Sequence, residues 1–270
     1  PELKQLAVAG TWMPLMTIGF NGRQPAGLAK VPQSSGWWSA ITAADLDGDG
    51  DLDLLAGNLG LNSDLQASAT EPLRLYLQDF DKNGATDPIM TYFRQGREVT
   101  FWGKDELTAQ MPGLRKKYND YAGFAEAAFG DIWDSTLVQQ VQLLEVQQLA
   151  SGWWEQQQGA WRFHPFPAAA QAFPIAAFGV LPAQKGHPLR LLAAGNFTDF
   201  QPAIGRMEAG LGVMLAQNAE GTFLEIPFYK SGWAVKGEVR QIAVSPEGNI
   251  FVARNGARPL IFQPATVEAE

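Results

Sequence analysis

Short apolar segments separated by turn residues fill most of this chain, and they predict many short β-strands. Residues 3–20 are predicted as two strands broken at Pro14, and the Asn21-Gly22 pair that follows is a strong turn signal. Comparable segments lie at 39–57, 73–93, 137–144, 147–154, 160–164 and 174–181, and from 189 to about 263. About eighteen strands are expected, which makes the predicted fold all-β.

One segment departs from this pattern, because residues 104–133 have apolar positions at helical spacing. Pro112 suits the first turn of a helix, and the apolar stripe after it consists of Leu114, Tyr118, Tyr121, Phe124 and Phe129. We therefore predict a helical insertion between strands, packed on the outside or at one end of the sheets. Such a stripe is typical of a helix face buried in a core rather than of a ligand groove.

Repeated strand endings indicate that the strands form similar units. The segments L-A-V-A-G (6–10), L-L-A-G-N (54–58), L-A-A-G-N (192–196) and F-V-A-R-N (251–255) are alike, and S-G-W-W occurs at 35–38 and 151–154. At four strands per blade, these strands would form a β-propeller of about four to five blades. The chain 1–270 is thus predicted as a single propeller-like domain. It forms either a compact ring or part of a larger ring, whose open edges would favour self-association.

The most distinctive stretch is the acidic segment from Asp45 to Asp53, which reads D-L-D-G-D-G-D-L-D. Carboxylates recur at every second position, and such close like charges destabilise a folded loop unless a cation lies among them. Gly50 allows the sharp turn that points the ligands inward. The expected Ca²⁺ ligands are the side chains of Asp45, Asp47, Asp49 and Asp53 and the backbone carbonyl of Asp51.

A second segment, from Asp79 to Asp87, repeats this frame with glycine again at the sixth position. Its expected ligands are Asp79, Asp81, Asn83, the backbone carbonyl of Ala85, and Asp87. An EF-hand is excluded, since the twelfth residues are Ala56 and Met90 instead of Glu and the flanks are strand-like. Because one frame occurs twice in one context, two Ca²⁺ sites are expected rather than two solvated acidic turns.

Other copies of the hairpin have lost the ligands. When Gly248 is aligned with Gly50, Ala243, Ser245 and Phe251 stand where the first loop has Asp45, Asp47 and Asp53. The sequence therefore predicts a strand hairpin there without a metal.

Each acidic segment lies between two predicted strands and has the pattern D-x-D-x-[DN]-G-x-x-D. This arrangement resembles the calcium-loop blade of FG-GAP/VCBS repeats, as in integrin-α-like β-propellers. Residues 35–62 also resemble the long repeat of bacterial VCBS proteins related to the cartilage-acidic-protein/UnbV group, and residues 6–14 and 114–125 look like further parts of that repeat. The resemblance covers most of the chain, and the two acidic loops are its specific part. It implies a β-propeller with protein or carbohydrate partners at its faces.

The charge and amino-acid composition limit the partners and chemistry that this chain can have. The net charge of −8 argues against a nucleic-acid partner, and two bound Ca²⁺ would reduce it to about −4. The absence of cysteine excludes disulfides, zinc thiolates and cysteine nucleophiles. Calcium loops favour an extracellular or cell-surface location. The resemblance implies a bacterial protein, for which the periplasm and the outer membrane are included. No apolar run is long enough to cross a bilayer, and the start at Pro1 suggests a mature protein or an excised piece.

Signatures of catalysis are few. His164 and His187 precede prolines in predicted turns, and the sequence contains no G-x-S-x-G elbow, P-loop or G-x-G-x-x-G. Asp105, Glu106, Asp131 and Asp134 flank the helical insertion and could serve glycoside chemistry. Five tryptophans are candidates for stacking on sugars or, as the preferred interpretation, for filling the core: Trp37, Trp38, Trp102, Trp153 and Trp154.

The sequence therefore favours a non-catalytic, calcium-stabilised propeller that acts in protein or carbohydrate binding or adhesion. One alternative is a carbohydrate-active enzyme, a glycoside hydrolase or polysaccharide lyase, on the same scaffold. Another is an accessory region that packs against neighbouring domains of a longer chain. Fold alone does not decide among them.

Overall fold

The computed structural model describes residues 5–134, 141–183, 188–199 and 205–264, and the description below concerns these residues. They are mostly β, with 43% in strands and 12% in helices. The strands form several small antiparallel sheets, and no sheet in the described part of the chain closes into a barrel. The prediction of a β-rich fold is confirmed.

The first strands make two small sheets. The N-terminal sheet contains β1 (Gln5–Val8), β3 (Met16–Asn21) and β4 (Gln24–Lys30) in the order β1-β3-β4. The predicted turn at Asn21-Gly22 joins β3 to β4, with Gly22 at a φ of 62°. A two-stranded ribbon pairs β2 (Thr11–Met13) with β5 (Gly36–Trp37), and its register shifts between Thr11 and Met13.

Two distant pieces of chain share the next sheet, here called the split sheet. The hairpin of β6 (Ala40–Ala44) and β7 (Asp53–Gly57) carries the first acidic loop. Almost a hundred positions later, β12 (Gly152–Gln157) and β13 (Ala160–Pro165) complete the order β13-β12-β7-β6. Leu55 lies opposite Trp153 in this register.

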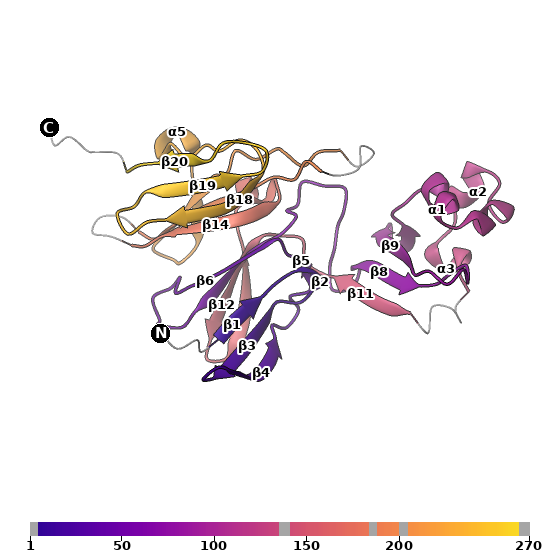
Figure 1. The fold of residues 1–270 in the computed structure, drawn as a ribbon, viewed down its shortest axis with the longest axis horizontal. Helices are drawn as coiled ribbons and strands as arrows, with labels where there is room; N and C mark the ends of the chain where they lie inside the picture. The colour runs from indigo at the N-terminus through magenta and orange to yellow at the C-terminus, as the bar shows by residue number, and fades with distance from the viewer. Residues whose placement is uncertain (1–4, 135–140, 184–187, 200–204, 265–270) are drawn as a thin grey trace.

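The inserted sheet occupies the stretch between β7 and β12. It has the order β10-β9-β8-β11, from β8 (Leu73–Gln78), β9 (Asp87–Arg94), β10 (Arg97–Thr100) and β11 (Gln142–Val146). The β8–β9 hairpin carries the second acidic loop. In Figure 1 this sheet and its helices extend away from the other sheets.

Short helices occupy the segment predicted as a helical insertion. They are α1 (Lys104–Gln110), the 3₁₀ helix η1 (Pro112–Lys116), α2 (Tyr121–Ala125) and α3 (Phe129–Ile132). Tyr118 and Phe129 from the predicted stripe are buried against Tyr76 and Phe80 of the inserted sheet and its loop. Tyr121 is 65% exposed, because the break between η1 and α2 interrupts the helical phase on which the stripe was based.

The C-terminal half forms two meanders. The meander sheet contains β14 (Ile175–Leu181), β15 (Arg190–Gly195), β16 (Val213–Gln217) and β17 (Phe223–Ile226) in chain order. The C-terminal sheet contains β18 (Val239–Val244), β19 (Ile250–Arg254) and β20 (Leu260–Phe262). The remaining short helices are η2 (Ala168–Gln171) and α5 (Phe228–Ser231).

Four of the sheets adjoin one another through their first strands. Strand β1 contacts β6, β6 contacts β14, and β14 contacts β18. Figure 1 shows β14 between β18 and β6. The N-terminal, split, meander and C-terminal sheets therefore follow one another in space as they do along the chain, with the inserted sheet outside this series.

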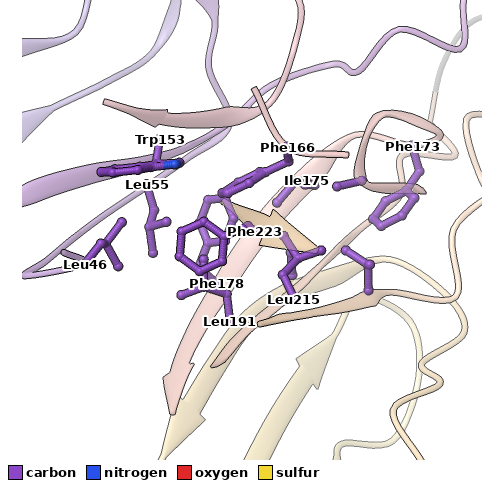
Figure 2. Close-up of a cluster of buried hydrophobic side chains, with 13 residues drawn as sticks. Leu46, Leu55, Trp153, Phe166, Phe173, Ile175, Phe178, Leu191, Leu215 and Phe223 are labelled. Atoms are coloured by element: carbon purple, nitrogen blue, oxygen red, sulfur yellow. The ribbon is translucent and has the colours of Figure 1, made fainter. Parts of the chain in front are cut away.

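The largest core cluster joins the split sheet to the meander sheet (Figure 2). Leu55 and Trp153 from the split sheet meet Phe178, Leu191 and other residues of the meander sheet. Trp38, Trp153 and Trp154 are all nearly inaccessible to solvent. For these three tryptophans the preferred interpretation, that they fill the core, is confirmed.

The repeated A-G-N strand endings have a common packing role. A Cβ atom on Gly57 would collide with the backbone carbonyl of Ile175, and one on Gly195 would collide with that of Pro174. The asparagines that follow are buried and donate to loop carbonyls, Asn58 to Gln148 at 2.7 Å and Asn196 to Gly210 at 2.8 Å. The motif therefore allows close approach of two backbones and then holds the loop that follows.

Candidate metal loops and an aromatic cleft

The first acidic loop joins β6 to β7 and gathers three carboxylates. Oxygens of Asp45, Asp47 and Asp49 lie within 4.8 Å of one another, and all three residues are exposed. The loop is held by its own side chains: Asp45 Oδ1 accepts from the Gly48 N–H at 2.7 Å, and Asp49 Oδ1 accepts from the Asp51 N–H at 2.8 Å. The carboxylates of Asp45, Asp47 and Asp49 therefore converge, as the sequence predicted.

The second acidic loop joins β8 to β9 in the same way. Oxygens of Asp79, Asp81 and Asp87 lie within 4.8 Å of one another. Asp79 accepts from the backbone N–H groups of Asn83, at 3.0 Å, and Gly84, at 2.8 Å. Asn83 contributes an amide oxygen, which accepts from the Ala85 N–H at 2.8 Å.

The two loops share hydrogen bonds as well as sequence. Leu46 N–H donates to Asp53 Oδ2 at 3.0 Å, and Phe80 N–H donates to Asp87 Oδ2 at 3.0 Å. At the third and fifth positions, the Asp49 and Asn83 N–H groups donate to Asp47 and Asp81 at 3.2 and 3.1 Å. The two segments therefore form one loop structure built twice, although no sheet contains both.

The aspartate at the ninth position of each loop is buried at the start of a strand, unlike the exposed residues near the loop tip. Asp53 and Asp87 are buried, and each anchors the loop to a neighbouring element. The second oxygen of Asp53 accepts from the Gln156 N–H at 2.9 Å, and that of Asp87 accepts from Gln110 Nε2 at 3.1 Å. Asp53 is not part of the three-carboxylate group of its loop, whereas Asp87 is. Asp51 and Ala85, expected to contribute backbone carbonyls, are exposed at the loop tips.

The electrostatics of the first loop suit a bound cation. Burial is the main cause that raises the pKa of Asp53 to about 6; the charges of Asp47 and Asp49 act in the same direction, and the two backbone N–H donors act against them. Loss of hydration, followed by the charges of Asp49 and Glu155, also raises the pKa of Asp47. A divalent cation among these oxygens would reverse both effects, because it favours the ionised form. The donor set, all oxygen and mostly carboxylate, fits Ca²⁺.

The fourth and sixth positions of both loops lie in the left-handed region. Gly48 and Gly50 have φ values of 83° and 93°, while Lys82 and Gly84 have values of 61° and 89°. Lys82 thus occupies a conformation that its equivalent, Gly48, adopts without a steric penalty. The backbone at Lys82 is therefore strained, whereas the backbone at Gly48 in the first loop is not.

We predict that Lys82→Gly raises the free energy of unfolding by about 0.5–1 kcal/mol, after the greater freedom of glycine in the unfolded chain is subtracted. Urea unfolding in EDTA measures the effect without any contribution from metal binding. Lys82→Ala is the matched control, since it removes the same charge but keeps the Cβ atom. An equal gain in both variants would attribute the effect to charge and contradict the conformational explanation.

The hairpin aligned with the first loop in the C-terminal sheet is present, as predicted. Strands β18 and β19 pair with Ala243 opposite Phe251, and Gly248 has a φ of 86°. Its turn is closed by Ser245 N–H donating to the Asn249 carbonyl at 2.8 Å.

A cleft of 850 Å³ lies between the inserted sheet and loops beside the meander sheet. It is lined by Leu59, residues 61–65, Tyr92, residues 101–103, Glu106, residues 172–174 and residues 206–209. A smaller cavity of 460 Å³, lined by Trp12 and Trp37, adjoins it, and Leu65, Phe101, Trp102 and Met207 line both. Of the five candidate tryptophans, Trp37 is half-buried and lines the smaller cavity, and Trp102 is half-buried and lines both spaces.

The sequence did not identify the rest of this cleft. Trp12, Phe101 and Arg206 belong to segments far apart in the chain, and no spacing connects them. The sequence offered one indication for Trp102, which lies two positions before the predicted helical insertion. Trp12 has a left-handed backbone with a φ of 62°, which sequence pattern does not predict.

The other candidate groups are dispersed. Of the four carboxylates near the helices, Glu106 lines the cleft, whereas Asp105 accepts from the Tyr121 hydroxyl at 2.9 Å and Asp131 accepts from the Ala128 N–H at 2.9 Å. Asp134 is exposed just after α3.

The prediction that His164 lies in a turn is wrong. It is in β13, stacked on Trp153 with ring centroids 4.5 Å apart, and its Nε2 lies 2.7 Å from Glu155. The strand continues to Pro165, because proline is tolerated at a strand end. His187 lies outside the described residues.

Comparison with models of known protein families, with curated proteins and with solved structures finds no match for this chain. The fold and the paired acidic loops thus define the class of protein: a mostly β protein of small antiparallel sheets with two equivalent acidic loops. Among the described residues, every helix is too short or too polar to cross a membrane.

Proposed function

We propose that this chain is a calcium-stabilised, non-catalytic binding protein with a β-propeller-like arrangement. The observation that carries the proposal is the equivalence of the two loops, in sequence frame, hydrogen bonds and left-handed positions. A solvated acidic turn has no reason to reproduce these features on two separate sheets. Calcium bound in each loop would neutralise the carboxylates and fix the hairpin.

The proposed blades are the N-terminal, split, meander and C-terminal sheets. The contacts from β1 to β6, from β6 to β14 and from β14 to β18 support this assignment, because innermost strands face one another around a propeller. The inserted sheet is proposed as an addition within the second blade. A series of four blades agrees with the lower limit expected from the strand count. The resemblance to FG-GAP/VCBS repeats supports the same arrangement.

A location outside the bacterial cytoplasm, in the periplasm or at the cell surface, is part of this proposal. Loops of this kind are filled where calcium is abundant, and extracellular calcium modules bind at about 10⁻⁴–10⁻³ M. In such surroundings the metal acts as a permanent structural element rather than as a signal.

Calcium is expected to raise the melting temperature, and excess EDTA to lower it. At a hundredfold excess over Kd, each site adds about 2.7 kcal/mol to the free energy of unfolding, since the unfolded chain has no site. Thermal melts with calcium, with magnesium and with EDTA measure the gain. Asp47→Ala and Asp81→Ala should each remove about half of it, because each removes one ligand from one loop.

The matched control is Glu220→Ala, which removes one exposed carboxylate from a turn outside both loops. It should retain the full calcium gain. Equal melting temperatures in calcium and in EDTA would refute the metal sites and leave the loops as acidic turns.

A second candidate function is a carbohydrate-active enzyme, favoured by the carboxylates of Asp64, Glu106 and Glu208 in the cleft lining. A glycosidase needs two carboxyl groups about 5–10 Å apart on either side of a sugar. Incubating the calcium-loaded protein with neutral oligosaccharides and measuring new reducing ends tests it. Release that is abolished by Glu106→Gln would establish catalysis, and unchanged oligosaccharides would favour binding alone.

A further inference from the structure

We infer that the 850 Å³ cleft and the 460 Å³ cavity beside it, together called the aromatic cleft, bind a neutral oligosaccharide, with Trp102 and the Trp12–Trp37 pair as stacking surfaces. The inference rests on the proposed binding function and names its site and its ligand class.

The size of the cleft suits a short chain of sugar rings. The 850 Å³ cleft lies within the range of small-ligand sites, about 300–1,000 Å³, and the adjoining 460 Å³ cavity extends it. Phe101 and Trp102 line both spaces, so these two rings can contact a ligand in either one.

The aromatic rings are fixed in orientation. Phe101 packs edge-on against Trp102 with centroids 5.0 Å apart, and Tyr92 packs edge-on against Phe101 at 6.4 Å. Trp12 and Trp37 lie 5.6 Å apart at an angle of 39°. The faces of such rings carry partial negative charge and attract the weakly positive C–H groups on the apolar face of a pyranose.

Trp12 is held in place at a conformational cost. Its φ of 62° lies in the left-handed region, which a bulky residue rarely adopts. The shift in register between Thr11 and Met13 in the ribbon of β2 and β5 accommodates it. Strained residues concentrate at sites where a side chain must point in one direction, which here is towards the cleft.

Polar groups at the rim complement the hydroxyl groups of a sugar. Asp64, Glu106 and Glu208 offer exposed carboxylate acceptors, and the Arg206 guanidinium lies 3.5 Å from Glu208. Asn62 is oriented by donating to the Ala172 carbonyl at 3.1 Å. A hydroxyl both donates and accepts, so a neutral sugar can pair with either kind of group.

The charge of the lining selects against acidic saccharides. The larger space has three carboxylates and one guanidinium among its lining residues. A uronate or sulfated sugar would be repelled by this excess of negative charge, whereas a neutral ligand is unaffected. A small quaternary ammonium ion is the competing occupant, since aromatic rings and carboxylates also attract cations.

The test is isothermal titration of the calcium-loaded protein with defined probes. These are the hexasaccharides of β-1,4-linked glucose, mannose and N-acetylglucosamine and of α-1,4-linked glucose, with hexagalacturonate and choline as competing classes. At least one neutral hexasaccharide should bind with a micromolar to millimolar Kd, and Trp102→Ala should weaken it by about tenfold or more. Tyr229→Ala, which removes a 72% exposed aromatic side chain on α5, should bind like the parent.

Circular dichroism establishes that each variant is folded, and Trp102→Leu replaces Trp102→Ala if the latter is not. Binding that survives loss of both the Trp12 and Trp102 rings would overturn the inference. So would binding of choline or hexagalacturonate alone, or no binding of any neutral probe at millimolar concentration. Parallel melts with calcium and EDTA separate the two proposals. The melts can refute calcium binding by the loops while titration still shows sugar binding in the cleft, and titration can refute sugar binding while the melts still show the calcium gain.

Discussion

Replacing Leu55 by alanine is expected to lower the free energy of unfolding by about 3–5 kcal/mol, a large part of the stability of a domain. Leu55 is fully inaccessible to solvent and lies in the cluster that joins the split sheet to the meander sheet (Figure 2). Both faces of β7 are buried, so that the surroundings have little freedom to fill the space left by the removed methyl groups.

Urea unfolding measures this effect, and Leu52→Ala is the control in the same hairpin. Leu52 is 53% exposed, and its loss should change the free energy of unfolding by less than about 0.5 kcal/mol. Similar costs for the two leucines would mean that the split and meander sheets do not share the tight core described above. An unchanged m-value is required for the comparison.

Asp87→Ala is expected to have two separable effects. In EDTA it should cost about 1–3 kcal/mol, because the buried Phe80 N–H loses its acceptor and the link to Gln110 is broken. In saturating calcium it should also forfeit the gain from the second site, about 2.7 kcal/mol at a hundredfold excess over Kd. Together these losses rival a large core substitution.

The control that separates the two effects is Asp81→Ala in the same loop. Asp81 is exposed and accepts from Asn83 N–H within the loop, so in EDTA its loss should cost less than about 1 kcal/mol. In calcium both variants should lose the same gain. Chemical unfolding of the parent and both variants, each with and without EDTA, gives the four differences needed. A calcium gain that persists in Asp87→Ala would show that Asp87 anchors the loop without binding metal.

Features encoded by local sequence were predictable. The two acidic hairpins, the Asn21-Gly22 turn and the helices within 104–133 all depend on residues close together in the chain, where turn chemistry and periodicity act directly. The side chains of Asp45, Asp47 and Asp49 converge because alternate positions of a tight loop point to one side. The hairpin without ligands in the C-terminal sheet follows from the same local pattern.

Features that depend on distant partners were not predictable. Trp37 and Trp38 are adjacent in the chain, yet Trp37 lines the smaller cavity, whereas Trp38 follows the end of β5 and is buried, with its Nε1–H donating to the Ser34 carbonyl at 2.8 Å. Trp153 and Trp154 are both buried, since β12 is an inner strand covered on both faces. The sequence also gave no indication that Asp53 would pair with the Gln156 N–H rather than join the carboxylates of its loop.

The pairing of β7 with β12 also constrains the order in which this protein folds. Asn58 N–H donates to Ser151 Oγ at 2.9 Å although the two residues are 93 positions apart. Closing a flexible loop of that length early would carry a high entropic cost. If the inserted sheet folds first, as it emerges from the ribosome, it brings these two ends together before β12 is complete. The second acidic loop, which lies in the inserted sheet, is then formed before the split sheet is complete.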